Sequence, residues 1–445
     1  MAETKSAVEI FECLLERAQT KKLPLISLRP KEISEMVSYE GDYDYYLPPA
    51  YMNELFQIVF DLAVEEKTSF TINRYKHGKA VIVLHNRSDN RSIFLEVWNM
   101  LSVKDPHKKT IRYIYPDQLA NHIVFDTNDV ASFSLDIEAL YYLSHLYTGG
   151  KKVSTPLVGY RISYYESALS QTGSKYAQWY QQLAEGTIDI KRAAHLANME
   201  LVEKEVLFLR HFVPVIQETK TKIASSLNRL KRQWLRMLNT IPVVGPDGVG
   251  KTTFIEAVLK KTTHKAGYFR FKKLFRSSPL YRIAFPILQR VLKKEVQYKF
   301  IGKTEVDDRY ASIVFVNGLL MFPFRLISTV LTGRLMLVDR YFHDYLLTNI
   351  RLNTGKAGLR ANWKMLLHWI PQQYWFIHLD ASTEIILSRK GELNADGIAS
   401  YRNDIFRAYL EQPFMIYTYL NTEATSEQCS DLIATVADTV ADIEL

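Results

Sequence analysis

The first 130 residues carry two kinds of hydrophobic period. Apolar residues recur at helical spacing over residues 8–18 and 51–63, which predicts two amphipathic helices. Short apolar or alternating runs, typical of strands, lie at residues 23–28, 43–47, 69–75, 79–84 and 93–98. We therefore expect residues 1–130 to form a small α+β domain.

Residues 131–238 are mostly polar, and their apolar positions follow helical spacing. The clearest pattern covers residues 136–148, and further patterns cover residues 202–212 and 221–238. These patterns predict a helical domain or linker over residues 131–238.

The last part, residues 239–445, contains apolar runs that do not alternate with polar residues. The runs lie at 241–244, 335–338 and 374–379, and a helical pattern follows the first of them. Such runs suit a parallel sheet that helices cover on both faces. The expected fold class is therefore α/β in this part, preceded by the α+β domain and the helical segment.

Composition and charge limit the kinds of protein that this chain can be. The 445 residues are 47% hydrophobic and 23% charged, as in an ordinary globular protein. Two cysteines exclude a disulfide scaffold and a zinc site built from cysteines. The net charge of +8 favours anionic partners such as nucleotides, phosphosugars, nucleic acid or an anionic membrane, and it equally suits solubility alone. No nucleic-acid-binding motif accompanies it.

The sequence predicts neither a secretory signal nor a membrane-spanning segment. Residues 1–22 are acidic and amphipathic, and they lack the apolar core of a secretory signal. The most apolar stretch, residues 311–331, approaches the length of a membrane span, but Asn317, Pro323 and Arg325 interrupt it. We expect this stretch to be a buried helix and the protein to be cytoplasmic.

A phosphate-binding motif follows the first buried run. The segment GPDGVGKT, which begins at Gly245, matches the pattern G-x-x-x-x-G-K-[ST]. Gly245, Gly248 and Gly250 let the backbone turn tightly, so that N–H groups and a helix N-terminus point at a phosphate. Lys251 supplies a positive charge to the β- and γ-phosphates, and the hydroxyl of Thr252 reaches Mg²⁺. The motif predicts a nucleoside triphosphate site, with ATP and Mg²⁺ as the expected cofactors.

The residues around this motif resemble the thymidylate kinase branch of the nucleotide kinases. Asp247 lies inside the loop, and GRLMLVDRY at residues 333–341 ends in an Asp-Arg-Tyr motif similar to that of the family. The resemblance covers nearly half of the chain. It implies a P-loop parallel sheet in which Asp339 lies near the metal and phosphates and Arg340 contacts the acceptor phosphate. In thymidylate kinase-like proteins encoded near polysaccharide genes another aspartate follows the motif, as Asp344 does here.

A lid is expected after the run at 374–379. Kinases need mobile cations over the triphosphate, because negative charge spreads over the transferred phosphoryl oxygens. The variable loop positions, residues 246–249, contain no arginine. The later segment resembles the kinase lid and the helix after it, so Arg389, Lys390 and Arg402 are the candidate cations. The alternative is a solvated basic turn.

One segment departs from the thymidylate kinase pattern. Residues 264–282 read HKAGYFRFKKLFRSSPLYR, where the family binds thymidylate with a different motif. The resemblance therefore does not identify the acceptor. Basic residues, including Arg270, alternate with aromatic ones there. Three explanations stay open: contact with a second phosphorylated substrate, peripheral contact with an anionic membrane, and the polar face of an amphipathic helix.

The first part of the chain holds a second candidate site. Asp42 and Asp44 alternate along a predicted strand and so share a face, and Glu96 lies on a later strand. This pattern resembles the nucleotidyltransferase fold, in which such carboxylates hold Mg²⁺. The Gly-Ser turn of that fold is absent, since residues 28–30 read Leu-Arg-Pro. The alternative is a solvated acidic turn.

The candidate residues fall into four roles. The expected catalytic residues are Lys251, Asp339, Arg340 and Arg389. The nucleotide is expected to bind at Gly245, Asp247, Gly248, Gly250, Lys251, Thr252, Thr253, Lys390 and Arg402. The acceptor is expected to bind at Arg340, Tyr341 and Asp344. The expected metal ligands are Thr252 and Asp339, with Asp42, Asp44 and Glu96 in the first domain.

Three hypotheses for function follow. The first is an ATP-dependent kinase that transfers the γ-phosphoryl group to a small-molecule acceptor, namely a nucleoside monophosphate, a sugar or a sugar phosphate, as in polysaccharide metabolism. In it, Asp339 or Asp344 orients or deprotonates the acceptor hydroxyl. The second is a bifunctional kinase and nucleotidyltransferase, and the third is a regulatory NTPase switch with a macromolecular partner. A homodimer is compatible with each of them.

Overall fold

A computed structural model describes the greater part of the chain. The described residues are 7–28, 43–76, 78–85, 92–107, 111–207, 223–224, 226–227, 230, 240–262, 265–271, 317–327, 331, 335–344, 370–371, 373–389, 393–411 and 416–423. The chain divides into two compact units. Unit 1 comprises Met1–Asp61, Lys76–Leu84 and Arg91–Asn228, and unit 2 comprises Leu62–Tyr75, His85–Asn90 and Arg229–Leu445. The predicted boundary at 130 lies inside unit 1, and the predicted boundary at 238 lies close to the division at 228.

Unit 1 mixes helices with short sheets. Four of its strands lie side by side in the order β1 (Ile26–Ser27), β2 (Tyr43–Tyr46), β5 (Ser92–Trp98) and β4 (Lys79–His85). Strand β2 runs parallel to β5 and antiparallel to β1. The helical elements beside these strands are α1 (Ala7–Thr20), η1 (Pro49–Tyr51) and α3 (Met52–Glu65), the last of which continues into unit 2. The expected α+β pattern of this region is therefore observed.

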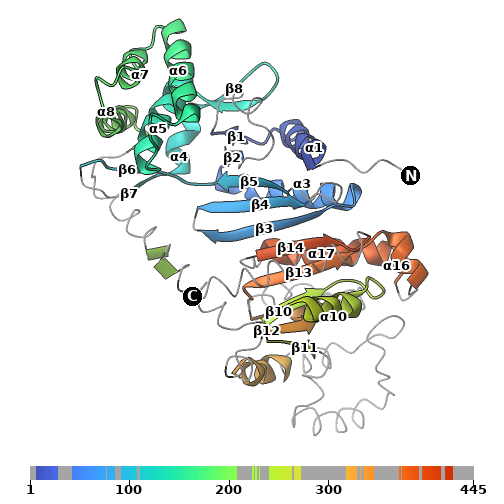
Figure 1. The fold of residues 1–445 in the computed structure, drawn as a ribbon. Coiled ribbons are helices and arrows are strands. Elements are labelled where there is room, and N and C mark those ends of the chain that lie inside the picture. Colours follow the sequence, from blue (N-terminus) through green and yellow to red (C-terminus); the bar gives the residue numbers. More distant parts are fainter. Residues whose placement is uncertain are drawn as a thin grey trace, which may run out of the picture. The chain divides into compact units, whose positions relative to one another are not determined.

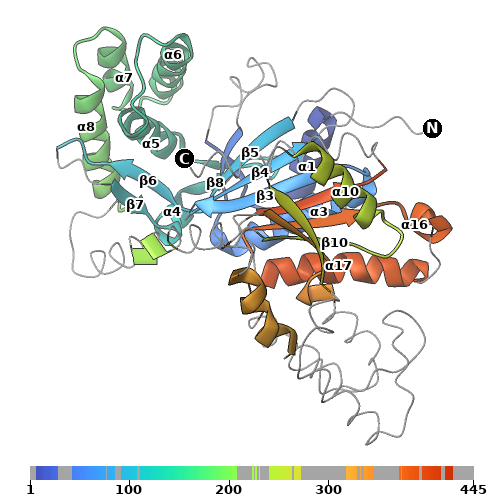
Figure 2. The ribbon, with the colours of Figure 1, turned by 60° about the horizontal axis from the view of Figure 1, so that its bottom comes forward.

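The remainder of unit 1 combines two antiparallel strand pairs with a helical bundle. The pairs are β6 (Leu101–Lys104) with β7 (Ile111–Ile114) and β8 (Ile123–Phe125) with β9 (Ala131–Phe133). Short helices α4 (Pro116–Leu119) and η2 (Ala120–His122) connect them. The bundle consists of α5 (Leu135–Thr148), α6 (Pro156–Gln171), α7 (Ala177–Ala184) and α8 (Ile190–Glu203), grouped in Figures 1 and 2. Both strand pairs and all four helices contribute side chains to one hydrophobic core.

The helix predicted at 202–212 is wrong for residues 204–207. Helix α8 ends at Glu203, and Glu205 has a positive φ of 60°. The chain turns back so that the N–H groups of Val206 and Leu207 both donate to the carbonyl of Leu201, at 2.9 and 2.8 Å. The two apolar residues are buried by this turn rather than by further helix. Residues 208–212, and most of the helix predicted at 221–238, lie outside the described residues.

Unit 2 contains the parallel sheet expected for the C-terminal part. Its strand order is β3 (Ser69–Lys76), β14 (Ile416–Asn421), β13 (Trp375–Asp380), β10 (Thr240–Val244), β12 (Leu335–Asp339) and β11 (Ala266–Arg270). All neighbouring pairs run parallel except β3 and β14, which are antiparallel. The described part of unit 2 is thus α/β, with a mainly parallel sheet flanked by helices.

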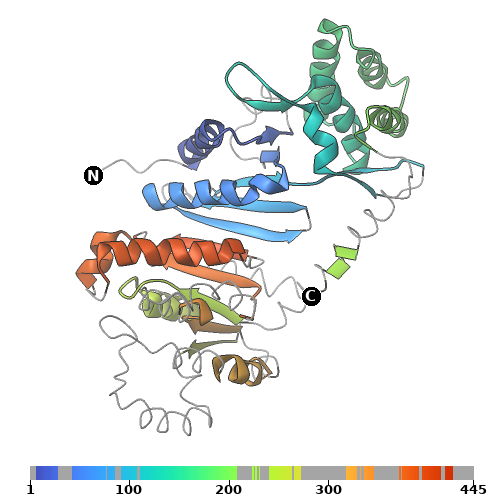
Figure 3. The same cartoon turned by 180° about the vertical axis from the view of Figure 1, so that it is seen from behind.

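Alternate residues of the central strands face two different helices. Ile377 of β13 shares a core with Ile255 of α10 (Lys251–Lys261). On β14, the ring of Tyr417 lies 5.5 Å from that of Phe406 on α17 (Ala395–Glu411). Figures 1 and 3 view the sheet from opposite sides, with α10 in front in one and α17 in front in the other. A short helix, α16 (Thr383–Arg389), follows β13.

Strand β3 belongs to unit 2 although more than 160 residues separate it from β10, the next strand of that unit along the chain. The buried ring of Phe70 stacks on Tyr419 at 5.5 Å, and the hydroxyls of Thr71 and Thr418 lie 3.0 Å apart. The hydroxyl of Ser69 accepts a hydrogen bond from the N–H of Asn421 at 3.0 Å. The strand therefore covers the edge of β14, whose backbone groups would otherwise be unpaired.

The apolar stretch at 311–331 is only partly described. Residues 317–327 are helical, with Asn317 and Phe322 buried. Leu320 and Phe324 are more than half exposed, so the expected helix is observed here but is only partly buried. Within the described ranges, no helix combines the length and the apolar composition needed to cross a membrane.

Substitution of Phe70 tests whether β3 is an integral part of unit 2. We expect Phe70→Ala to lower the free energy of unfolding by about 3–5 kcal/mol, because it leaves a cavity between Tyr417, Tyr419 and Phe406. Phe94→Ala is the matched control, since that ring is 44% exposed. Denaturant unfolding of the full chain measures both, and equal effects would contradict the placement of β3.

Acidification should destabilise unit 2 through buried histidines. Burial lowers the pKa of His378 to about 3 and that of His85 to about 4, below the unfolded value near 6.5. At a pH between the folded and unfolded pKa values, the histidine is protonated in the unfolded chain but neutral in the folded chain. The free energy of unfolding is therefore greatest above pH 6.5 and falls toward pH 4. At pH 5 each such histidine should lower the free energy of unfolding by about 2 kcal/mol.

The contribution of one histidine can be isolated. His378→Gln should reduce the loss of stability between pH 7.5 and pH 5 by about 2 kcal/mol. Tyr417→Phe removes the hydroxyl that lies 2.7 Å from Nδ1 of His378 but keeps the imidazole. It should therefore retain the pH dependence. Thermal unfolding as a function of pH distinguishes the two variants, and an unchanged slope in His378→Gln would refute the assignment.

Candidate active site

The phosphate loop lies between β10 and α10, as the motif requires. Gly245 follows the buried end of β10, with a φ of 154°. A Cβ at this position would lie 2.4 Å from the carbonyl oxygen of Leu379 on β13, so only glycine fits. Gly250, with a φ of 96°, precedes Lys251 at the start of α10. The loop therefore places the N-terminus of α10 at the carboxyl end of the sheet, where ligands of such sheets bind.

The side chain of Lys251 is buried inside this loop. Its Nζ donates to the carbonyl oxygens of Gly245 and Pro246, at 2.7 and 2.9 Å, and lies 3.4 Å from Oδ1 of Asp247. Burial lowers the pKa of this amine, Arg340 lowers it further, and Asp247 opposes the shift. A buried cation that contacts two carbonyls and one carboxylate is well placed to attract a phosphate.

Asp339 ends strand β12 beside the loop, because Val243 of β10 is its partner in the sheet register. The carboxylate is buried, and its Oδ2 accepts a hydrogen bond from the hydroxyl of Tyr268 at 3.0 Å. The guanidinium of Arg270 lies 3.8 Å from the same oxygen. Within the described part of the chain, Oδ1 of Asp339 has no hydrogen-bond partner. A buried oxygen of this kind fits the role of a Mg²⁺ ligand.

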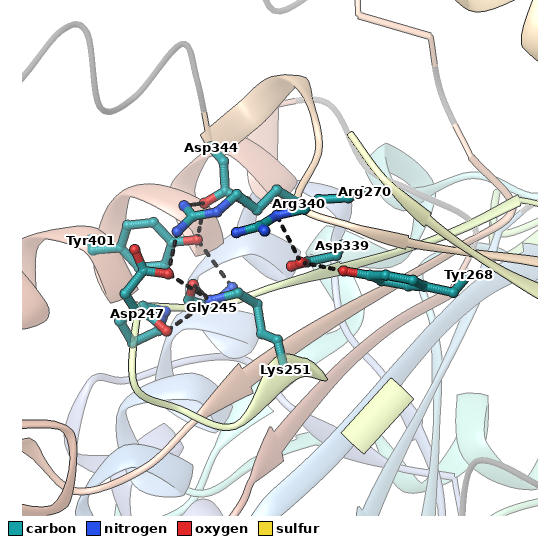
Figure 4. Close-up of polar contacts among 10 residues, drawn as sticks. Gly245, Asp247, Lys251, Tyr268, Arg270, Asp339, Arg340, Asp344 and Tyr401 are labelled. Atoms are coloured by element: carbon teal, nitrogen blue, oxygen red, sulfur yellow. Dashed lines mark hydrogen bonds and ion pairs between the residues drawn. The ribbon is translucent and has the colours of Figure 1, made fainter. Parts of the chain in front are cut away.

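Arg340 turns back toward the loop. Its φ is 71°, a conformation that is unfavourable for a residue with a side chain, and its N–H donates to the carbonyl of Val243 at 2.9 Å. The guanidinium pairs with Asp247, and it lies 3.7 Å from Oδ1 of Asp344 (Figure 4). The predicted acceptor-binding arginine is thus beside the phosphate loop, where it is held by two carboxylates.

Asp344 and Tyr341 are both buried but have different surroundings. Oδ1 of Asp344 accepts a hydrogen bond from the hydroxyl of Tyr401. Burial raises the pKa of Asp344, while Arg340 and the other neighbouring donors hold it down. The hydroxyl of Tyr341 instead donates to the carbonyl of Pro371 at 2.6 Å within an aromatic cluster. The proposed contact of Tyr341 with the acceptor therefore stays a prediction without support from its position.

The three predicted lid cations have different positions. Nη1 of Arg389, at the end of α16, lies 3.8 Å from where a Cβ of Gly250 would be, so its guanidinium is beside the loop. Arg402 instead pairs through two nitrogens with Asp380 and donates to the carbonyl of Ala381 at 3.1 Å. That arginine joins α17 to β13 in this arrangement. Lys390 lies outside the described residues.

The two threonines that follow Lys251 are on the surface. Thr252 and Thr253 lie in the first turn of α10 and are exposed, so their hydroxyls are open to a ligand.

Sequence reasoning missed the connection that Tyr401 makes between α17 and Gly245, whose N–H donates to the tyrosine hydroxyl at 3.1 Å. It also missed Tyr268. Both tyrosines lie in ordinary helix or strand patterns, so no local signal marks them.

The candidate metal site of unit 1 contains an internal cation. Asp44 and Glu96 are opposite each other in the parallel pair β2 and β5, as a shared site requires. The buried ammonium of Lys79 pairs with Glu96 and lies 4.6 Å from the ring centroid of Trp98. Nε1 of Trp98 donates to Asp44 at 3.4 Å. Burial raises the pKa of Glu96, with Lys79 opposing the shift and Asp44 adding to it.

This arrangement bears on the proposed metal ligands. Among the described residues, no three histidine, cysteine, aspartate or glutamate side chains are grouped to hold a metal ion. Asp42 lies outside the described residues, so the three-carboxylate site stays a prediction. Of the two described carboxylates, Glu96 pairs with the ammonium of Lys79, and Asp44 accepts a hydrogen bond from Trp98.

The likeness of this chain to known proteins comes from solved structures. No protein-family model matches the chain, and no curated protein matches it. Among solved structures, the chain is similar to deoxyadenosine kinase from M. mycoides, whose structure holds dCMP and a flexible dCDP. The match has 17% sequence identity and a TM-score of 0.30, and it covers 45% of this chain and 99% of the other.

Removal of the ammonium of Lys79 from unit 1 should lower the free energy of unfolding. Lys79→Met leaves Glu96 and Asp44 partly buried without a neutralising charge, and we expect a loss of about 3 kcal/mol in the free energy of unfolding. The double variant Lys79→Met/Glu96→Gln should recover most of this loss, because the unpaired charge is removed as well. Chemical denaturation measures both, and additive losses would show that the pair does not interact.

Proposed function

We propose that this chain is an ATP-dependent phosphotransferase that acts on a small-molecule acceptor with Mg²⁺. The observation that carries the proposal is the position of Lys251. Its buried amine lies within the phosphate loop, and Asp339 and Arg340 lie at the end of the adjacent strand. A phosphate cradle and a carboxylate–guanidinium pair at one sheet edge are the components that phosphoryl transfer needs.

On the donor side, the loop binds and orients the triphosphate. The N–H groups at the start of α10 and the amine of Lys251 attract the β- and γ-phosphates. Mg²⁺, held by the hydroxyl of Thr252 and by Oδ1 of Asp339, would neutralise charge on the two phosphates when bound. The guanidinium of Arg389 beside Gly250 stabilises the charge that spreads over the transferred group.

On the acceptor side, two cations lie near the end of β12. Arg340 directly follows this strand, and Arg270 of β11 lies 3.8 Å from the carboxylate of Asp339 (Figure 4). This arrangement favours an anionic acceptor such as a nucleoside monophosphate or a sugar phosphate. Asp344 is engaged by Tyr401 and Arg340, so Asp339 is the better candidate to orient the acceptor hydroxyl.

The two alternative functions differ in what they require of unit 1 or of a partner. A bifunctional enzyme requires divalent metal at Asp44 and Glu96, where the ammonium of Lys79 is bonded to Glu96. A regulatory switch requires only hydrolysis of the nucleotide, stimulated by a macromolecule. Neither alternative is favoured by a particular contact of the described residues.

Transfer of label from γ-³²P-ATP tests the proposal directly. Purified full-length protein is incubated with Mg²⁺ and a panel of nucleoside monophosphates, sugars and sugar phosphates. We expect a labelled acceptor, and Lys251→Ala should reduce its rate of formation by about 10²- to 10³-fold, because the transferred group loses its buried cation. Lys260→Ala, an exposed lysine on the same helix, should retain the rate.

The other outcomes separate the alternatives. Release of inorganic phosphate alone, across the whole panel, would contradict the phosphotransferase and favour the regulatory switch. A nucleotidyl product that disappears in Asp44→Asn but persists in Lys251→Ala would favour the bifunctional enzyme.

A further inference from the structure

Gly245 is contacted by side chains or backbone from three different elements. Its N–H donates to the hydroxyl of Tyr401 on α17 at 3.1 Å, and its carbonyl accepts from Nζ of Lys251 on α10 at 2.7 Å. The carbonyl oxygen of Leu379 on β13 fills the space where a Cβ would lie. The start of the phosphate loop is therefore fixed by one hydrogen bond on each side of the glycine and by one close contact.

These two hydrogen bonds respond differently to a bound nucleotide. An ammonium has three donors, and those of Lys251 have acceptors in Gly245, Pro246 and Asp247. If Lys251 is to bond a phosphate, it must release at least one of these partners. The bond from Gly245 to Tyr401 involves no group that a phosphate replaces. It is thus the contact that holds the loop in place while Lys251 changes partners.

The same hydroxyl reaches the acceptor side of the site. Tyr401 donates its proton to Oδ1 of Asp344, which lies 3.7 Å from Nη1 of Arg340. Tyr401 and Asp344 are 3% and 2% exposed, so water competes little for these bonds. Figure 4 shows the tyrosine on one side of the loop, with its hydroxyl between Gly245 and Asp344. One oxygen atom therefore contacts both the donor loop and the carboxylate behind the acceptor arginine.

We propose that Tyr401 is a positioning residue of the phosphate site, which fixes Gly245 on the donor side and, through Asp344, Arg340 on the acceptor side. The proposal rests on the proposed phosphotransferase function. It also makes α17 a fixed support of the loop rather than part of a moving lid. The next residue, Arg402, pairs with Asp380 at the end of β13 and anchors the same turn of the helix.

The test compares two substitutions that each remove one hydroxyl from α17. Tyr401→Phe deletes both hydrogen bonds, whereas Tyr409→Phe, about two turns further along the helix, alters a buried tyrosine that packs on Tyr417. The affinity of the full-length protein for ADP is measured by calorimetry, with thermal unfolding in parallel. We expect Tyr401→Phe to weaken ADP binding about tenfold and Tyr409→Phe to leave it unchanged.

Steady-state kinetics separate positioning from a general structural role. In Tyr401→Phe the KM for ATP should rise about tenfold while kcat changes less than about threefold, because the lost bonds hold the nucleotide site in both the ground and transition states. Equal ADP affinities in the two variants, or a loss confined to thermal stability, would overturn the proposal.

A second variant tests the acceptor side. Asp344→Asn keeps an oxygen for the hydroxyl of Tyr401 but removes the charge that faces Arg340. It should bind ADP within about twofold of the wild type and lose at least about tenfold in kcat/KM for the acceptor. Unchanged acceptor kinetics would overturn this half of the proposal.

Failure of the proposed function gives a different result. Wild-type protein that binds ADP but labels no acceptor would refute the phosphotransferase, while the effect of Tyr401→Phe on ADP binding would still be measurable. Wild-type protein that does not bind ADP would refute both.

Discussion

The carbonyl oxygen of Leu379 lies 2.4 Å from where a Cβ at position 245 would be, and the rest of the candidate site depends on this close approach. Because only glycine fits there, the loop can start directly beside β13 and then turn into α10. That turn places the amine of Lys251 against the carbonyls of Gly245 and Pro246. It also brings the loop within reach of the helix α17 through Tyr401. One backbone contact thus sets the positions of the groups around a phosphate.

The carboxylates around the loop have two different roles. Asp247 and Asp344 both face Arg340, and they fix its guanidinium beside the loop. Asp339 instead accepts a hydrogen bond from the hydroxyl of Tyr268 and has a more distant guanidinium nearby, and one of its oxygens has no hydrogen-bond partner among the described residues. Burial makes every unpaired charge costly, so a buried carboxylate is either paired or ready for a cation. The same rule applies in unit 1, where the cation is the ammonium of Lys79.

The agreement between sequence and structure is good where a pattern is local. The helix after the motif, the buried strand before it and the strand that ends in Asp339 lie where their apolar runs predict them. The prediction is wrong at Val206 and Leu207, because two apolar residues can be buried by a turn as well as by a helix. Arg402 shows another limit. Its position after the lid suggested a cation for the nucleotide, yet the structure pairs it with Asp380, a neighbour that the spacing does not reveal.

The sequence by itself determined the phosphate loop, the parallel sheet that carries it and the residue types available for phosphoryl chemistry. These features depend on the order of residues within short segments, and their physical requirements are local. Only the tertiary structure decided which side chains meet there. Tyr401 and Gly245 are 156 positions apart, and Arg340 and Asp247 are 93 positions apart. Strand β3 likewise reached β14 from the first part of the chain. Such pairs form because packing of helices on a sheet brings distant segments together, and no period or motif in either segment specifies its partner.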